Sequence, residues 1–140
     1  MSVRSDFRDS IRATLTTAFS ASGIPFEAGK IEGPQHDRDV GCVWWEGKRP
    51  WVRDGNEEEN FYRVRVLRRF RQDQGAAEPK ETLDDILMST AEALEDALKD
   101  VLITAGHQLF TVAEVTSDHE RQLVEAQLTA YDRNRSAVGS

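Results

Sequence analysis

The chain has 140 residues, a formal net charge of −7 at pH 7 and a charged fraction of 31%. This length fits one folded domain, and we expect residues 1–140 to form it, with a flexible tail over residues 133–140. The apolar runs fall far short of the ~20 residues that cross a bilayer, which argues against a membrane protein. The single cysteine excludes an intrachain disulfide, and we expect the protein to be made and kept in the cytosol.

The N-terminal segment is predicted to be an amphipathic helix over residues 5–21. Apolar residues recur every four positions from Phe7 to Phe19 and form one stripe. Gly23 and Pro25 end the helix. The following apolar pieces, from Ile24 to Val52, are separated by glycine and proline, which predicts two or three short strands, most clearly residues 40–45.

The segment from Phe61 to Arg71 alternates between apolar and basic residues. It predicts a strand with one dry face, formed by Tyr62, Val64, Val66 and Phe70, and one cationic face, formed by Arg63, Arg65, Arg69 and Arg71. An acidic turn over residues 53–60 is expected before this strand, and a loop over residues 72–79 after it. Five arginines within eleven residues of an acidic protein require acidic partners, which favours assembly or polyanion contact over catalysis.

A second amphipathic helix is predicted from Thr82 to Gly106, with an acidic polar face. Thr82 and Asp85 have the spacing of a capping box at its start. The basic strand and this acidic helix are expected to give the protein two surfaces of opposite sign.

The C-terminal part is predicted to be a hairpin with strands over residues 109–115 and 123–132 and a turn over residues 116–121. Glu125 alternates with apolar residues in the last strand. If this strand lies beside the basic strand, Glu125 can pair with an arginine. The whole order of elements predicts an α+β fold, in which two helices pack on one face of a mainly antiparallel sheet and the arginines lie on the other.

The patterns that could support catalysis or cofactor binding are weak. His36, His107 and His119 lack the spacing of metal ligands, and residues 36–39 are more typical of a solvated turn than of a general-base cluster. Cys42 lies in an apolar run that favours a packed thiol over a nucleophile. No glycine-rich phosphate loop is present. We therefore predict no enzyme, no catalytic or metal site and no cofactor.

The adjacent residues Trp44 and Trp45 must point to opposite faces of a strand, so one ring lies outside a single-sided core. Either a loop or the arginine face covers that ring through cation–π contact, or the ring anchors a subunit interface.

Three explanations remain open for the arginine face. The guanidiniums pair with Glu125 and nearby acids of the same chain, with the acidic surface of an adjacent copy, or with nucleic acid. RNA-binding sheets usually expose aromatic rings that stack on bases, whereas the exposed positions here are arginines. This difference counts against the nucleic-acid explanation.

The chain as a whole resembles the tail terminator, or tail completion, proteins of long-tailed bacteriophages. The resemblance lies in an N-terminal helix closed at residues 21–25, short strands, the charged strand of residues 61–71, a long acidic helix of residues 82–105 and a closing hairpin that ends with residues 124–131. It consists of element order, length and charge pattern.

The resemblance implies a structural virion protein that caps the tail tube as a homo-oligomeric ring, expected to have six members. Such a ring ends tube polymerisation, forms the head-tail joining surface, contacts the tail tube and head-tail connector proteins, and lets DNA pass through its lumen without specific binding. It would be assembled in the host cytoplasm and located in the virion tail. In this family the sheet faces the ring and its lumen, which makes Arg63, Arg65, Arg69, Arg71, Glu125, Trp44 and Trp45 candidate interface or lumen residues.

One departure from the family expectation is the set of arginines itself, because phosphate binding would retard DNA in the lumen. We therefore expect these arginines to be neutralised by acids of the same or the next subunit. If the partners lie in the next subunit, replacing Arg65 and Arg69 with glutamate should abolish the ring and leave the fold intact. The alternative function is a cytosolic protein- or nucleic-acid-binding module that uses the arginine-rich strand.

Overall fold

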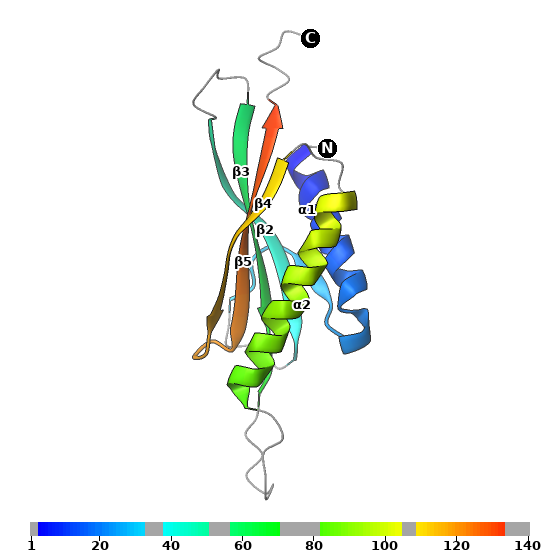
Figure 1. Ribbon diagram of the computed structural model, residues 1–140, viewed down its shortest axis with the longest axis vertical. Helices are drawn as coiled ribbons and strands as arrows, with labels where there is room; N and C mark the ends of the chain where they lie inside the picture. Colours follow the sequence, from blue (N-terminus) through cyan, green and yellow to red (C-terminus); the bar gives the residue numbers. More distant parts are fainter. Residues whose placement is uncertain (1–2, 33–37, 51–56, 71–81, 105–108, 134–140) are drawn as a thin grey trace, which may run out of the picture.

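The computed structural model describes residues 3–32, 38–50, 57–70, 82–104 and 109–133, and they form one five-stranded sheet with two α-helices on one side (Figure 1). The elements are α1 (Val3–Ala18), a 3₁₀ turn (Ser20–Ser22), β1 (Phe26–Ala28), β2 (Val40–Pro50), β3 (Glu57–Leu67), α2 (Leu83–Thr104), β4 (Leu109–Asp118) and β5 (Leu123–Arg133). The strand order is β1-β2-β3-β5-β4, with β1 parallel to β2 and every other pair antiparallel. The predicted α+β class, with a mainly antiparallel sheet and two helices on one face, is confirmed.

The hydrophobic core lies between the helices and the sheet. α1 packs over β1 and β2, while α2 packs over β4 and β5, and the two helices also contact each other. The helices contribute the fully buried Phe7, Ile11, Leu15, Leu94 and Leu98, and the strands contribute Tyr62, Val64, Val66, Val124, Ala126, Leu128 and Ala130. The predicted alternation of β3 and β5 is therefore confirmed for these residues.

The end of α1 and the start of α2 follow local sequence signals. α1 ends at Ala18 and continues into the 3₁₀ turn, which closes at Gly23 with a left-handed φ of 69°. At the start of α2, the Thr82 backbone N–H and hydroxyl donate to Asp85 Oδ2, and the Asp85 N–H donates back to Thr82 Oγ1 at 3.1 Å. The predicted capping box is thus formed, and these hydrogen bonds lower the pKa of Asp85. Gly106 lies outside the described residues.

A glycine allows β1 to join the sheet. Phe26 of β1 pairs with Gly41 of β2, and the Phe26 ring lies where a Gly41 side chain would project. A Cβ at position 41 would lie 2.3 Å from that ring. Gly41 therefore permits the aromatic side chain of the short edge strand to pack closely against the backbone of its neighbour.

The bounds of the arginine-bearing strand differ from the prediction at both ends. β3 starts at Glu57, because Glu59 bonds to Arg49 and Asn60 accepts from Trp45, so polar residues expected in a turn have cross-strand partners. β3 ends at Leu67, because the Arg69 N–H donates to Asp39 Oδ1 at 2.6 Å instead of to a neighbouring strand. Residues 57–60 of the expected turn therefore belong to β3, residues 53–56 lie outside the described residues, and the predicted strand end at residue 71 is corrected to Leu67.

The C-terminal hairpin is present, with its turn shifted. β4 continues to Asp118, so the predicted turn of residues 116–121 is corrected to residues 119–122. Asp118 accepts a hydrogen bond from the Arg121 N–H, and Gln122 has a φ of 57°. The hairpin closes only when a residue in the left-handed region reverses the chain.

Two β-bulges lie at the same level of the sheet. One inserts Glu46 into β2 opposite Tyr62 and Phe61, and the other inserts Ala113 into β4 opposite Gln127 and Leu128. Each bulge exchanges the residues that face the two sides of its strand. In β2 the exchange turns Arg49 towards Glu59 and the Phe61 ring on the helix-free side.

Candidate functional site

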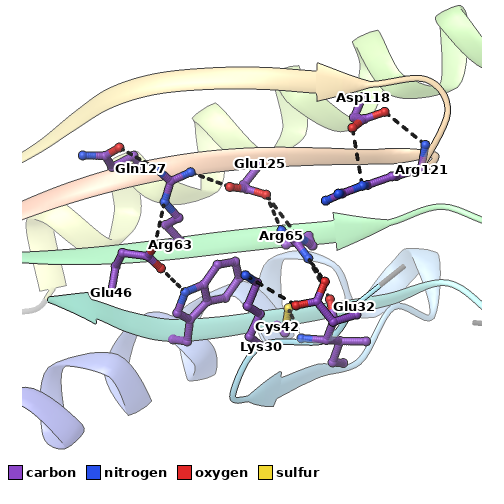
Figure 2. Close-up of polar contacts among 12 residues, drawn as sticks. Lys30, Glu32, Cys42, Glu46, Arg63, Arg65, Asp118, Arg121, Glu125 and Gln127 are labelled. Carbon is purple, nitrogen blue, oxygen red and sulfur yellow. Dashed lines mark hydrogen bonds and ion pairs between the residues drawn. The ribbon is translucent and has the colours of Figure 1, made fainter. Parts of the chain in front are cut away.

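The helix-free side of the sheet carries a network of charged and polar side chains, which we call the charged face. It consists of Trp44 and Glu46 on β2, Arg63 and Arg65 on β3, and Glu125 and Gln127 on β5. These side chains meet because antiparallel pairing sets Arg65 opposite Glu125 and Arg63 opposite Gln127. Figure 2 shows Glu125 between the two guanidiniums.

Glu125 is the centre of this network. Its Oε1 accepts from Arg63 Nη1 at 2.5 Å, and its Oε2 accepts from Arg65 Nε at 3.0 Å. A second Arg65 nitrogen, Nη2, lies 2.9 Å from the same Oε2. The predicted pairing of Glu125 with an arginine is therefore confirmed, and one carboxylate serves both arginines.

The ionisation of Glu125 reflects two opposing effects. Burial of the carboxyl group by itself raises its pKa, but the hydrogen bonds and positive charges of Arg63 and Arg65 outweigh this effect, so the pKa of Glu125 is lowered. The carboxylate therefore stays ionised to a lower pH than an ordinary glutamate does.

Arg65 also holds a loop segment on the sheet. Residues 29–32, which we call the strap, follow β1 and cross the helix-free side. The Ile31 carbonyl accepts from Arg65 Nη1 at 2.9 Å, and the Ile31 N–H donates to Cys42 Sγ at 3.4 Å. Glu32 Oε2 lies 4.0 Å from Arg65 Nη1. Arg65 is 4% exposed, so its guanidinium is fully used within the chain.

Arg63 is surrounded by acceptors as well. Beyond its bond to Glu125, its Nη2 donates to Gln127 Oε1 at 3.2 Å, and its Nε lies 3.9 Å from Glu46 Oε1. The other oxygen of Glu46 accepts from the Trp44 indole N–H. The bulge residue Glu46 thus links the arginine pair to the tryptophan.

The two tryptophans point to opposite sides, as predicted. Trp44 lies on the charged face and is 8% exposed, beneath the Arg65 guanidinium at 5.1 Å and Lys30 of the strap at 5.7 Å. Of the two explanations for the outward ring, covering by an arginine and a loop is therefore observed. Trp45 lies on the helix side, donates its indole N–H to Asn60 Oδ1 and is 39% exposed.

A small apolar cluster at one end of the charged face was not predicted from the sequence. Val40, Leu67 and Leu123 are buried there, one on each of three neighbouring strands, and Ile31 of the strap covers them. In the β3 alternation, Leu67 lies on the same side as Arg63 and Arg65. An apolar residue at this position of the sequence was the one signal that indicated a cluster on this face. The strap is therefore held by apolar contacts as well as by Arg65.

The other candidate arginines are not part of the described charged face. Arg69 is exposed beyond the end of β3, and Arg71 lies outside the described residues. Arg68 reaches the helix side, where its Nη1 donates to Thr90 Oγ1 at 2.7 Å and its Nε lies 3.6 Å from Asp39 Oδ1. Arg68 therefore lies on the side of the chain that the alternation assigns to apolar residues, while the apolar Leu67 lies on the side of the arginines.

We expected that replacing Arg65 and Arg69 with glutamate would leave the fold intact. For Arg65 this expectation is corrected. A glutamate there would place a carboxylate beside Glu125 and Glu32 in a site that excludes water. That substitution would destabilise the monomer, so it cannot report on assembly alone.

The face is also not the cationic surface that the sequence suggested. Glu32, Glu46 and Glu125 lie within 4.0 Å of Arg63 or Arg65. Because three carboxylates accompany two guanidiniums, the expected contrast between a basic sheet and an acidic helix is corrected to a sheet face of mixed sign.

The candidate reactive groups are placed as follows. Cys42 is fully buried, and burial raises the pKa of its thiol, as expected for a packed side chain. His119 Nε2 lies 2.8 Å from Asp84 Oδ1, while His36 and His107 lie outside the described residues. Within the part of the chain that the structure describes, no group of three or more His, Cys, Asp or Glu side chains is placed to hold a metal ion.

Comparison with known proteins gives no family assignment. A scan against protein-family models finds no match, and a search of the curated proteins finds no significant match. Over the described residues, neither helix combines the length and the hydrophobicity needed to span a membrane.

Proposed function

We propose that this protein is a structural component of a long-tailed phage, which caps the tail tube as a ring of identical subunits. In this role it ends tube polymerisation and forms the surface on which the head docks. The observation that carries the proposal is the order of elements: helix, short strands, charged strand, long acidic helix and closing hairpin, folded into one sheet with both helices on one side (Figure 1). The resemblance to tail terminators rests on this same order.

The charges of the sheet face support this role. A ring whose sheet borders the lumen must let DNA pass, and available guanidiniums would bind its phosphates. Here Arg63 and Arg65 are engaged by Glu125, Gln127 and the strap. The neutralisation occurs within one chain, so a lumen lined by this face would not depend on a neighbouring subunit for its charge balance.

The alternative, a module that binds nucleic acid or an acidic protein through the arginine strand, draws no support from these contacts. Binding a polyanion through Arg65 would require breaking its bonds to Glu125 and Ile31. A titration of labelled duplex DNA at several salt concentrations addresses this alternative. We expect no binding above that of other acidic proteins, whereas a steep loss of affinity with salt would favour the module.

The ring is tested with the purified full-length chain. Sedimentation velocity should detect a discrete oligomer at high protein concentration, and negative-stain images should contain closed rings, with six subunits expected. Tubes polymerised from a tail tube protein of the same phage should stop growing and carry the protein at one end. Only monomers at high concentration, together with no binding to these tubes, would contradict the proposal.

A further inference from the structure

Two large apolar side chains are exposed among the described residues, and they belong to elements in different halves of the fold. Trp45 of β2 is 39% exposed and Met88 of α2 is 52% exposed. β2 belongs to the half of the sheet that α1 covers, while α2 covers the half formed by β4 and β5. A side-to-side contact between two copies could therefore use one residue from each.

The orientation of Met88 follows from its helix. Asp84, one turn earlier, lies 2.8 Å from His119 in the β4–β5 turn. Residues four apart share one stripe of a helix, so Met88 faces the same hairpin side. Exposed acids flank it at positions 84, 85, 92 and 95, which makes this an apolar side chain within an acidic surface. We call it the Met88 patch.

Trp45 has the complementary surroundings. Its ring is held by the hydrogen bond from its indole N–H to Asn60 Oδ1 at 3.0 Å. The β2 bulge turns Lys48 to the same side, because Trp45 pairs with Tyr62 and Lys48 with Asn60, two alternate residues of β3. Lys48 is exposed. Trp45 and Lys48 form an apolar and basic surface, which we call the Trp45 patch.

We propose that the Met88 patch of one copy packs on the Trp45 patch of the next copy in the ring. A methionine sulfur and thioether carbons pack favourably on an indole ring, and Lys48 would face acids such as Glu92. The two patches differ and belong to different halves of the fold, and a head-to-tail ring requires two such different patches on each copy. This inference rests on the proposed ring and names the contact that closes it.

The test uses the fact that this contact joins two different patches, one from each copy. Met88→Asp removes one patch and leaves the Trp45 patch intact, while Trp45→Ala does the reverse. Each variant alone should be a monomer, with self-association weakened about tenfold or more. An equimolar mixture should give a one-to-one dimer that cannot grow, because a single intact contact remains. Ala93→Asp, an added acid at another exposed position of α2, is the control and should form rings.

A charge exchange keeps the test informative if Trp45→Ala does not fold. Lys48→Glu and Glu92→Lys should each weaken association, and the double variant should restore it. Arg38→Glu, at an exposed arginine that pairs with exposed Glu27, serves as the charge-reversal control.

The outcomes separate this contact from the ring itself. Rings formed by Met88→Asp or Trp45→Ala alone would overturn the contact and leave the ring proposal standing. Rings from the unchanged chain combined with a purely monomeric mixture would do the same. Monomers from the unchanged chain under all conditions would overturn both.

Discussion

The two faces of the sheet are built from the same strands by different physical means. On the helix side, Tyr62, Val64 and Val66 of β3 are fully buried among apolar helix residues. On the other side, Arg63 and Arg65, which alternate with them, donate hydrogen bonds to one carboxylate, one amide and one backbone carbonyl. Burial of apolar area needs no defined partner atom, whereas burial of a guanidinium needs several at fixed positions.

This difference explains which parts of the fold could be predicted from the sequence. The helix-covered face follows from periodicity, because any apolar residue at the right spacing contributes to a core. The pairing of Glu125 was also predictable, since register sets it opposite Arg65. The parts played by Glu46 and by the strap residues Ile31 and Glu32 could not be predicted. A bulge and the path of a loop determine the positions of these residues and leave no periodic signal in the sequence.

The end of β3 was missed for a related reason. The predicted strand continues to residue 71, but the backbone N–H groups of Arg69 and Phe70 bond to side chains of Asp39 and Gln122. Such side-chain acceptors compete with a neighbouring strand for the backbone. They come from distant parts of the chain, so local pattern cannot reveal them.

The largest effect is expected from truncation on the helix-covered face. Phe7 is fully buried with its ring 5.0 Å from that of Tyr62, so Phe7→Ala should lower the free energy of unfolding by about 3–5 kcal/mol. Phe61 lies half-buried on the other face, and the matched variant Phe61→Ala should cost about 1 kcal/mol. Urea denaturation of both variants measures this contrast. Equal losses would remove the distinction between the faces.

A smaller loss, about 2–3 kcal/mol, is expected from Glu125→Gln, because Arg63 and Arg65 would lose their shared charged acceptor. Because folding lowers the pKa of Glu125, its contribution is fully present above the unfolded value of about 4.3 and is lost as the pH falls further. The difference between the two proteins should therefore shrink below about pH 4. Urea midpoints at neutral and acidic pH provide the measurement, and a pH-independent difference would refute the ionic explanation.

The smallest effect is expected at the start of α2, away from both faces. Thr82→Ala removes the hydroxyl that caps the Asp85 N–H and should lower the free energy of unfolding by about 1 kcal/mol. Thr82→Ser keeps the hydroxyl and should be nearly neutral. If thermal melts show the same loss for serine as for alanine, the capping hydrogen bond does not account for it.

Arg63 and Arg65 of β3 are neutralised within their own chain. A double-mutant cycle of Arg65→Met and Glu125→Gln tests it directly, measured by urea denaturation at a concentration at which sedimentation detects only monomers. We predict a coupling free energy of about 1–3 kcal/mol between the two positions. Coupling near zero in the monomer, which emerges only when copies associate, would place the partner of Arg65 in another subunit and contradict the account.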